Sequence, residues 1–243
     1  MFPIIRIGPF SLQAPGLMLL LSLWIGITLA EKSAKAYKVS PEKLSNLIFV
    51  ALVAGVLGAR IAYIAQFPQA FSKNLFNMLS LNPGLLDVTG GTVAAIIGAF
   101  VYGQKKEMDL WKTLDALIPF FGMLAIGLAT ANLASGDAFG VETTLPWGIE
   151  LWGAKRHPTQ IYALIGALVT LNLLYPPKQG ARFQTGMSFL TFVAATTGYT
   201  LFIEAFRGDS TLIWGGIRAE QVATFIVLAV ALWMLDKRLR VVA

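Results

Sequence analysis

The stretch LSNLIFVALVAGVLGARIAYIAQ, residues 44–66, decides the class of fold. Arg60 is the one charged side chain in it. The hydrocarbon core of a bilayer is roughly 30 Å thick, and a helix needs about 20 mostly apolar residues to cross it. The stretch therefore predicts a helix that spans a membrane.

The composition extends this prediction to the whole chain. Of the 243 residues, 56% are hydrophobic and 13% are charged, whereas soluble domains are about 25% charged. One soluble core cannot hide so much apolar surface, which indicates a polytopic membrane protein. The chain has no cysteine and one histidine, so disulfides, cysteine nucleophiles and a zinc site are not expected. We expect no cofactor and no metal.

Apolar runs of spanning length recur along the sequence. Lipid cannot satisfy an open backbone, so all of them should be helices, and the strand alternation of an outer-membrane barrel is absent. The fold predicted is all-α, with seven transmembrane helices in a single integral membrane domain, residues 1–243. The seven predicted spans are residues 12–30, 44–66, 88–103, 112–135, 158–175, 184–206 and 217–236.

The loops differ in positive charge. Segments 31–43, 104–112, 176–183 and 237–243 carry twelve Lys and Arg residues, against six on the other side. By the positive-inside rule, the N-terminus lies outside and the C-terminus in the cytoplasm. The net charge of +6 needs no nucleic acid partner, because anionic lipid of the inner leaflet explains it.

Polar side chains gather near the predicted outer ends of several spans. Ionisable groups are costly inside a bilayer, so we expect them to line one polar cavity that opens outward. In particular, Arg60, Asn132, His157 and Arg207 should meet there. The other polar members of this set are Tyr63, Asp137, Arg156, Gln160, Glu204 and Arg218, and the Gly90-Gly91 pair lies near the same surface.

Simpler roles remain open for individual residues. Charged groups at helix ends often reach the headgroups, and Trp147, Trp152 and Trp214 are typical of an interfacial belt. Asp115 is expected to be a structural cap or a packing partner rather than a catalyst. His157 is either a cap at the start of a helix or a group that binds a headgroup or accepts a proton, because histidine ordinarily titrates near neutrality.

The order of the motifs resembles the prolipoprotein diacylglyceryl transferase family over nearly the whole chain. The motifs that carry this resemblance are FPIIRIGPFSLQAPGLMLLLSLWIG, GARIAYIAQF, TGGTVAAIIG, LDALIPFFGMLAIGLATANLASGDAFG, RHPTQIYALI and FIEAFRGD.

The resemblance implies transfer of a diacylglyceryl group from phosphatidylglycerol to the cysteine of a lipoprotein signal peptide, in the bacterial inner membrane. The expected partners are phosphatidylglycerol, the lipoprotein signal peptide and membrane lipid. Arg60, Arg156 and Arg207 would hold phosphate, because a guanidinium binds it with paired hydrogen bonds. Asn132 and Asp137 would orient the headgroup, and Glu204 would fix an arginine. The resemblance also makes Gly140 part of the substrate-binding site. His157, Glu204 and Arg207 are the candidate catalytic residues.

The chain departs from the family pattern at several characteristic positions. Ala129 and Thr200 stand where the family has arginines, and Thr89 stands where it has a histidine. Thr196 replaces a tyrosine, Ser135 an asparagine and Asp137 a glutamate. Loss of one such cation commonly costs about 10²-fold in rate. The alternative function is therefore a catalytically inactive paralogue that binds phospholipid or signal peptide. A small transporter is a third hypothesis, which the lack of inverted repeats disfavours.

Overall fold

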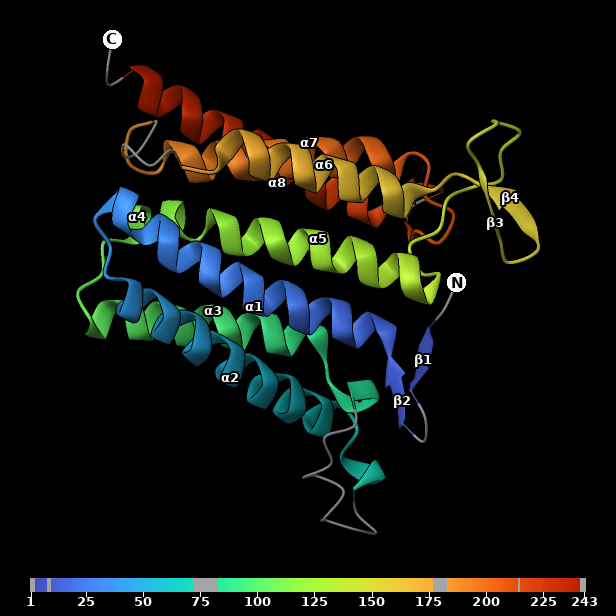
Figure 1. Cartoon of the computed structure of the whole chain (residues 1–243), viewed down its shortest axis with the longest axis horizontal. Coiled ribbons are helices and arrows are strands. Elements are labelled where there is room, and N and C mark those ends of the chain that lie inside the picture. The colour runs from blue at the N-terminus through green and yellow to red at the C-terminus, as the bar shows by residue number, and fades with distance from the viewer. Residues whose placement is uncertain (1–2, 8–9, 72–82, 177–182, 214, 241–243) are drawn as a thin grey trace.

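The computed structural model describes residues 3–7, 10–71, 83–176, 183–213 and 215–240 (Figure 1). The described part is mostly helical. Its α-helices are α1 (Ala14–Ala34), α2 (Pro41–Gln66), α3 (Val88–Lys105), α4 (Leu110–Ala116), α5 (Ile118–Ser135), α6 (Thr159–Leu174), α7 (Met187–Glu204) and α8 (Ala219–Arg240). Short 3-10 helices are η1 (Lys35–Tyr37), η2 (Pro68–Ala70) and η4 (Pro83–Leu85).

Within the described residues, six short strands pair into three antiparallel two-stranded sheets, which we call hairpins. These are β1 (Ile4–Ile7) with β2 (Phe10–Gln13), β3 (Ile149–Leu151) with β4 (Ala154–Arg156), and β5 (Leu212–Ile213) with β6 (Ile217–Arg218). The β3–β4 turn has positive φ at both central residues, 55° at Trp152 and 77° at Gly153. Two-residue hairpin turns of this kind match the strand twist.

The helices overlap the predicted spans. Both α1 and α8 end four residues later than predicted, and two further differences have a structural cause. The first helix begins at Ala14, because Leu12 and Gln13 belong to β2. The fourth predicted span, 112–135, is broken at Leu117 into α4 and α5. Pro119 lies two residues after Leu117 and has no backbone N–H to continue the helical hydrogen bonds. Lys73, Lys178, Arg182 and Trp214, which entered the sequence predictions, lie outside the described residues.

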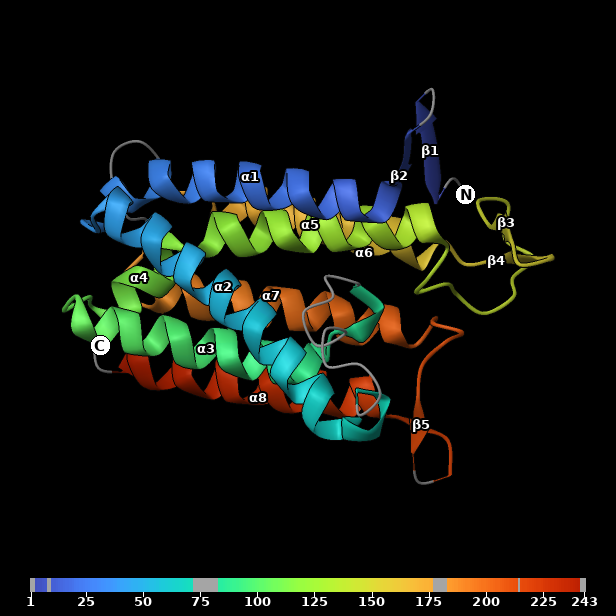
Figure 2. The ribbon, with the colours of Figure 1, turned by 90° about the horizontal axis from the view of Figure 1, so that it is seen from below.

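The long helices run side by side in three tiers (Figures 1 and 2). The α2–α3 pair forms one tier, α1 and α5 form the middle, and α6, α7 and α8 form the third. The hairpins gather at one end of this bundle, and the two described ends of the chain lie at opposite ends of it. We call the end of the bundle that carries the hairpins the hairpin end.

Small residues allow the α2–α3 pair to pack closely. A Cβ added at Gly58 would lie 2.1 Å from the Ala94 Cβ, and one at Gly90 would lie 2.2 Å from the Ala62 Cβ. A Cβ at Gly91 would lie 2.9 Å from the Ala59 Cβ. Close approach through small residues is the usual way in which helices associate in lipid.

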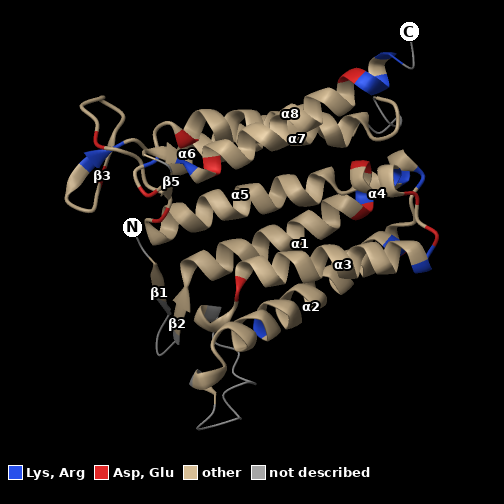
Figure 3. Cartoon of the chain, turned by 180° about the vertical axis from the view of Figure 1, so that it is seen from behind, with Lys and Arg blue, Asp and Glu red and all other residues tan. Residues whose placement is uncertain are grey.

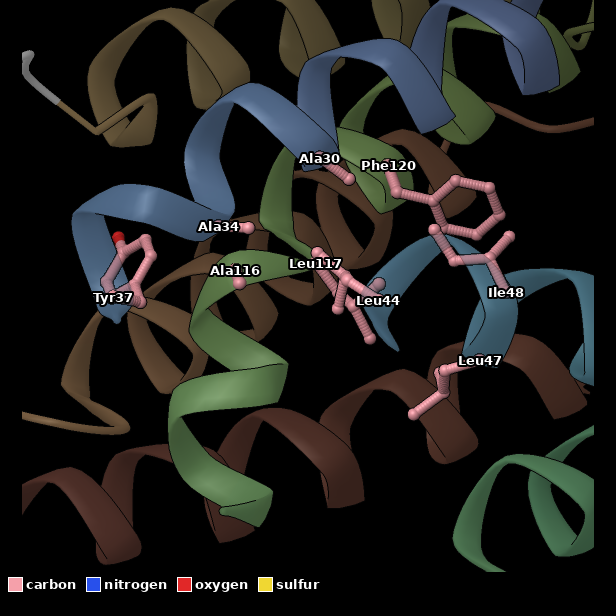
Figure 4. Packing of buried hydrophobic residues seen from close by; sticks show 9 residues of the cluster. All are labelled: Ala30, Ala34, Tyr37, Leu44, Leu47, Ile48, Ala116, Leu117 and Phe120. Carbon is pink, nitrogen blue, oxygen red and sulfur yellow. The ribbon is translucent and has the colours of Figure 1, made fainter. Parts of the chain in front are cut away.

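The hydrophobic core cluster lies at the end opposite the hairpins, where α1, α2, α4 and α5 meet (Figure 4). Polar groups inside this region are paired: Ser33 Oγ donates to the Ala116 carbonyl (2.6 Å). Asp115 accepts from the backbone N–H groups of Gly186 (2.6 Å) and Phe189 (2.8 Å). Asp115 therefore caps the start of α7, as expected, where a negative charge also suits the helix dipole.

The exterior of the bundle suits a lipid solvent. Large apolar side chains such as Phe49, Ile61 and Ile96 are exposed, whereas Gln160 and Glu204 are buried. Charged residues gather toward the two ends of the helices (Figure 3). By length and apolar composition, three helical segments of the described chain qualify on their own as spans: residues 14–37, 41–66 and 118–135. The apolar α6 is shorter than these three.

Candidate functional site

The segment that follows α5 forms the centre of the hairpin end. It pairs with the chain after α7 on one side, where Val141 N donates to the Phe206 carbonyl (2.8 Å). On its other side, His157 N donates to the Val141 carbonyl (3.0 Å). Residues from three distant parts of the sequence are thereby fixed at one place.

Gly140 lies where these segments come closest. Its backbone bridges to Arg207, and a Cβ added to it would lie 2.4 Å from the His157 carbonyl oxygen and 2.5 Å from the His157 Cβ. The obstacle is largely backbone, which cannot rotate away. Only glycine fits here, so Gly140 sets how closely His157 approaches Arg207.

Arg156 fastens the same segment from the side. Its Nε donates to the Leu151 carbonyl (3.1 Å), and its Nη2 pairs with Glu142 Oε1 at 3.5 Å. The guanidinium also lies 5.1 Å from the centre of the Phe139 ring. Its described hydrogen bonds are thus made with the segment between α5 and α6 that carries it.

The residues around Asp137 form a turn at the end of α5. Ser135 Oγ donates to Asp137 Oδ2 (2.7 Å), and the Asn132 carbonyl accepts from Gly136 N (2.8 Å). Gln160 Nε2 donates to the Asp137 carbonyl (2.8 Å). Gln160 is 2% exposed, and its Oε1 is buried with no hydrogen-bond partner among the described residues. A ligand that donates a hydrogen bond would satisfy this oxygen.

Arg207 is surrounded by three carboxylates. Its Nη1 pairs with Glu204 (2.7 Å) and with Glu220 (2.6 Å), and its Nε pairs with Asp209 (2.9 Å). Burial alone would lower the pKa of Arg207, but the hydrogen bonds with Asp209 and Glu204 outweigh it and raise that pKa above its ordinary value. Arg207 is therefore a permanent cation.

Glu204 links this group to the next hairpin. Its side chain is 1% exposed, and its Oε2 accepts from Ser210 Oγ (2.7 Å). Its backbone carbonyl accepts from Arg218 Nη1. The Arg207 network, meaning Glu204, Arg207, Asp209, Ser210, Arg218 and Glu220, ties the end of α7 to the start of α8. It contains two arginines and three carboxylates.

His157 stands between this network and α6. Its ring centre lies 5.0 Å from that of Phe206, and its Nδ1 lies 3.3 Å from the Tyr162 hydroxyl. The Tyr162 hydroxyl in turn accepts from Trp147 Nε1 (2.9 Å). His157 is thus held from both sides by aromatic residues.

A second group of predicted site residues lies on α2 and α3 at the same end of the bundle. Arg60 is 9% exposed; its Nη1 donates to the Leu85 carbonyl (2.9 Å), and its guanidinium faces the Phe71 ring at 5.3 Å. The Tyr63 and Phe67 rings are 4.9 Å apart. Gly90 and Gly91 pack against α2, as described above. Gly90 and Gly91 therefore allow α2 and α3 to pack closely.

The structure therefore arranges the predicted residues in two groups. The larger group includes Asp137, Gly140, Arg156, His157, Gln160, Glu204, Arg207 and Arg218, with Asn132 at its edge. Arg60, Asn132, His157 and Arg207 are all buried or half-buried, so none extends into the surroundings. A hollow of about 480 Å³ lies beside the larger group and is lined by Glu142, Thr143, Thr144 and Lys155.

Sequence reasoning missed several participants. Asp209 and Ser210 were not noticed, although Asp209 lies two residues after Arg207 in the FRGD motif. Tyr162 and Glu220 were placed near the outer ends of their spans but were not chosen as site residues. Trp147 was expected to be an interfacial residue and is 58% exposed, and its indole N–H bonds to Tyr162. A pattern based on one sequence carries no signal for such contacts between distant loops.

Comparison with known proteins identifies the family. Residues 3–236 match the family model described as prolipoprotein diacylglyceryl transferase. The chain belongs to this family. The phosphatidylglycerol–prolipoprotein diacylglyceryl transferase of Finegoldia magna is 30% identical over 217 residues, which cover 88% of this chain and 86% of that protein. The enzyme of the same name from Thermotoga maritima is 30% identical over 93% of this chain and 80% of its own length.

Membership of the prolipoprotein diacylglyceryl transferase family makes the chain a multi-span membrane protein. The positions at which the sequence is expected to depart from the family pattern lie in different surroundings. Ala129 is buried within α5, Thr200 is half-buried on α7, and Thr89 is exposed in the first turn of α3. Two of the replacements contact each other, since Ser135 donates to Asp137.

Proposed function

We propose that this protein transfers a diacylglyceryl group from phosphatidylglycerol to the cysteine of a lipoprotein signal peptide. The thiol sulfur attacks the glyceryl carbon, the bond from that carbon to the phosphate oxygen breaks, and glycerol phosphate leaves. A thioether forms and the thiol proton is lost. The match of nearly the whole chain to one transferase family carries this proposal.

The larger group of polar residues suits the phospholipid headgroup. Arg156 and Arg207 would meet the phosphate, whose charge grows as the leaving group departs, and Arg60 would add a third cation. The glycerol of the headgroup brings hydroxyl donors. The buried Oε1 of Gln160 would accept from one of them, with Asn132 and Asp137 nearby.

The Arg207 network limits how phosphate binds. The ion pairs of Arg207 with described residues use Nε and Nη1. They leave Nη2 available to a ligand. The network has one more carboxylate than arginines, so its net negative charge would oppose an incoming phosphate. Glu220 is the most exposed of the three and the easiest to displace.

The pairing of Arg207 with three carboxylates also favours a second candidate, a family member that binds phospholipid or signal peptide without transferring lipid. Arg207 would then be a structural clamp, and Ala129, Thr200 and Thr89 would mark the loss of catalytic groups. Both candidates predict binding of phospholipid or of signal peptide. They differ in whether a product forms.

Complementation separates them. Cells depleted of their own transferase should grow when they carry this chain, and the Arg207→Ala variant should not support growth. Expression of both proteins in the membrane must be measured. If the wild-type chain is present in the membrane and growth fails, while a known relative restores it, the second candidate is favoured.

We also propose seven membrane crossings in the bacterial inner membrane, with the hairpin end outside. An odd number of crossings agrees with chain ends at opposite ends of the bundle (Figure 1). The excess of Lys and Arg in the other set of loops agrees with that orientation. In this arrangement α4 and α5 together make one crossing.

A further inference from the structure

Three aromatic and heteroaromatic side chains form a hydrogen-bonded chain beside the Arg207 network. Trp147 Nε1 lies 2.9 Å from the Tyr162 hydroxyl, and that hydroxyl lies 3.3 Å from His157 Nδ1. Trp147 comes from the loop before β3, His157 from the end of β4, and Tyr162 from the first turns of α6. The three residues therefore bring together separate elements.

The direction of these hydrogen bonds follows from the groups themselves. An indole N–H only donates, so the Tyr162 oxygen must accept from Trp147. The hydroxyl then has its own proton to give, and His157 Nδ1 is the acceptor within reach. If the hydroxyl accepted from both neighbours, its proton would have no acceptor among the described residues.

The position of the imidazole is fixed independently of this chain. His157 N donates to the Val141 carbonyl (3.0 Å), and Gly140 fits directly against the His157 Cβ. Phe206 packs on the ring. The ring therefore has little freedom to turn away from Tyr162.

We propose that Trp147 and Tyr162 are positioning residues that hold neutral His157 as the tautomer with its proton on Nε2. In a neutral imidazole one nitrogen donates and the other accepts, and Tyr162 occupies the accepting one. His157 then presents an N–H donor to the site. It binds an oxygen of the ligand, and it does not remove the thiol proton.

The binding role of His157 rests on the proposed function, because it names the phosphate of phosphatidylglycerol as the ligand of Nε2–H. The assignment of the tautomer does not rest on that function. It concerns the tautomer of the resting protein, which can be measured without substrate or activity.

The sequence makes the measurement unusually direct, because His157 is the only histidine in the chain. The full chain, purified through a tag without histidine and labelled with [15N]histidine, gives nitrogen signals from this imidazole alone. Nuclear magnetic resonance in lipid nanodiscs, at a pH where the ring is neutral, distinguishes protonated from unprotonated ring nitrogen. We expect one dominant tautomer, with Nδ1 unprotonated.

Two variants and a control test the cause. Tyr162→Phe removes the donor, and Trp147→Phe frees the hydroxyl to turn away. Each should shift the tautomer ratio by about fivefold, the effect of one ordinary net hydrogen bond. Trp152→Phe is the matched control, since Trp152 lies in the same hairpin region but donates to the Gly136 carbonyl (2.9 Å). It should leave the ratio as in the wild type.

A dominant Nδ1–H tautomer in the wild type would overturn the inference, as would a ratio that Tyr162→Phe leaves unchanged. The role toward phosphate has a separate readout in binding of phosphatidylglycerol. His157→Gln keeps an N–H donor near the position of Nε2, and it should restore most of the binding lost in His157→Leu. If the tautomer is as expected but neither substitution affects lipid binding, the role toward phosphate fails and the tautomer assignment stands.

Discussion

Gly140 is the residue on which the geometry of the site depends most. The Gly140 backbone pairs with Arg207 on one side and contacts His157 on the other. The atoms nearest to an added Cβ belong largely to the His157 backbone, which cannot move aside. Sequence reasoning selected Gly140 through a family resemblance. The structure supplies the physical reason, which is contact with the His157 backbone.

Substitution of Gly140 by alanine should therefore weaken the whole hairpin end. The added methyl group would force apart two backbone segments, at a cost of about 1–3 kcal/mol. The thermal midpoint of the purified protein, followed by loss of monodisperse material on heating, should fall by several degrees. Gly198→Ala is the control, because no atom lies within 4 Å of a Cβ at that helical position. Equal midpoints for the two variants would refute the proposed close approach.

Glu220 controls how much of the charge of Arg207 a phosphate can reach. Glu220→Gln removes one carboxylate from Nη1 and should tighten binding of phosphatidylglycerol by up to about fivefold, as expected for one partly exposed ion pair. Binding to the protein in detergent can be measured by native mass spectrometry. Asp236→Asn is the matched control, because Asp236 pairs with Arg240 at the far end of α8. Weaker or unchanged binding in Glu220→Gln would mean that Arg207 does not hold the lipid phosphate.

At the scale of the element, the helices were predictable and the connections between them were not. Apolar runs of spanning length gave the positions of α2, α3 and α6 within three residues. The break at Leu117 was missed, although the sequence carries signals for it in the polar residues of α4 and in Pro119. The hairpins were missed because they depend on backbone pairing, such as that between β3 and β4, which has no periodic signal in so short a segment.

The α2–α3 pair allows a test of whether Gly90 serves packing or the substrate. Gly90→Ala should destabilise the protein, because its Cβ would lie 2.2 Å from that of Ala62. Adding Ala62→Gly removes the opposing methyl group and should restore most of the lost thermal stability. This double-mutant cycle isolates the contact between the two positions.

The outcome also separates the two roles in the transfer reaction. If stability returns in the double variant and transfer does not, Gly90 contacts the substrate as well as α2. If stability does not return, the packing explanation for Gly90 is wrong.

At the scale of the whole molecule, the orientation of the bundle can be tested cleanly because the chain has no cysteine. A single cysteine at exposed Glu150, in β3, should react with a maleimide reagent that cannot cross the inner membrane. One at exposed Lys106, between α3 and α4, should react only after the membrane is broken. The reverse pattern would place the hairpin end in the cytoplasm, where no lipoprotein signal peptide would present its cysteine to it.

The central claim is that the residues gathered at the hairpin end still transfer lipid, although Ala129, Thr200 and Thr89 replace groups typical of the family. Mass spectrometry of a lipobox peptide incubated with the purified protein and phosphatidylglycerol tests this most directly. We predict a gain equal to one diacylglyceryl group, which requires phosphatidylglycerol and is lost in Arg207→Ala. An unchanged peptide mass with folded wild-type protein, beside an active relative under the same conditions, would contradict the claim.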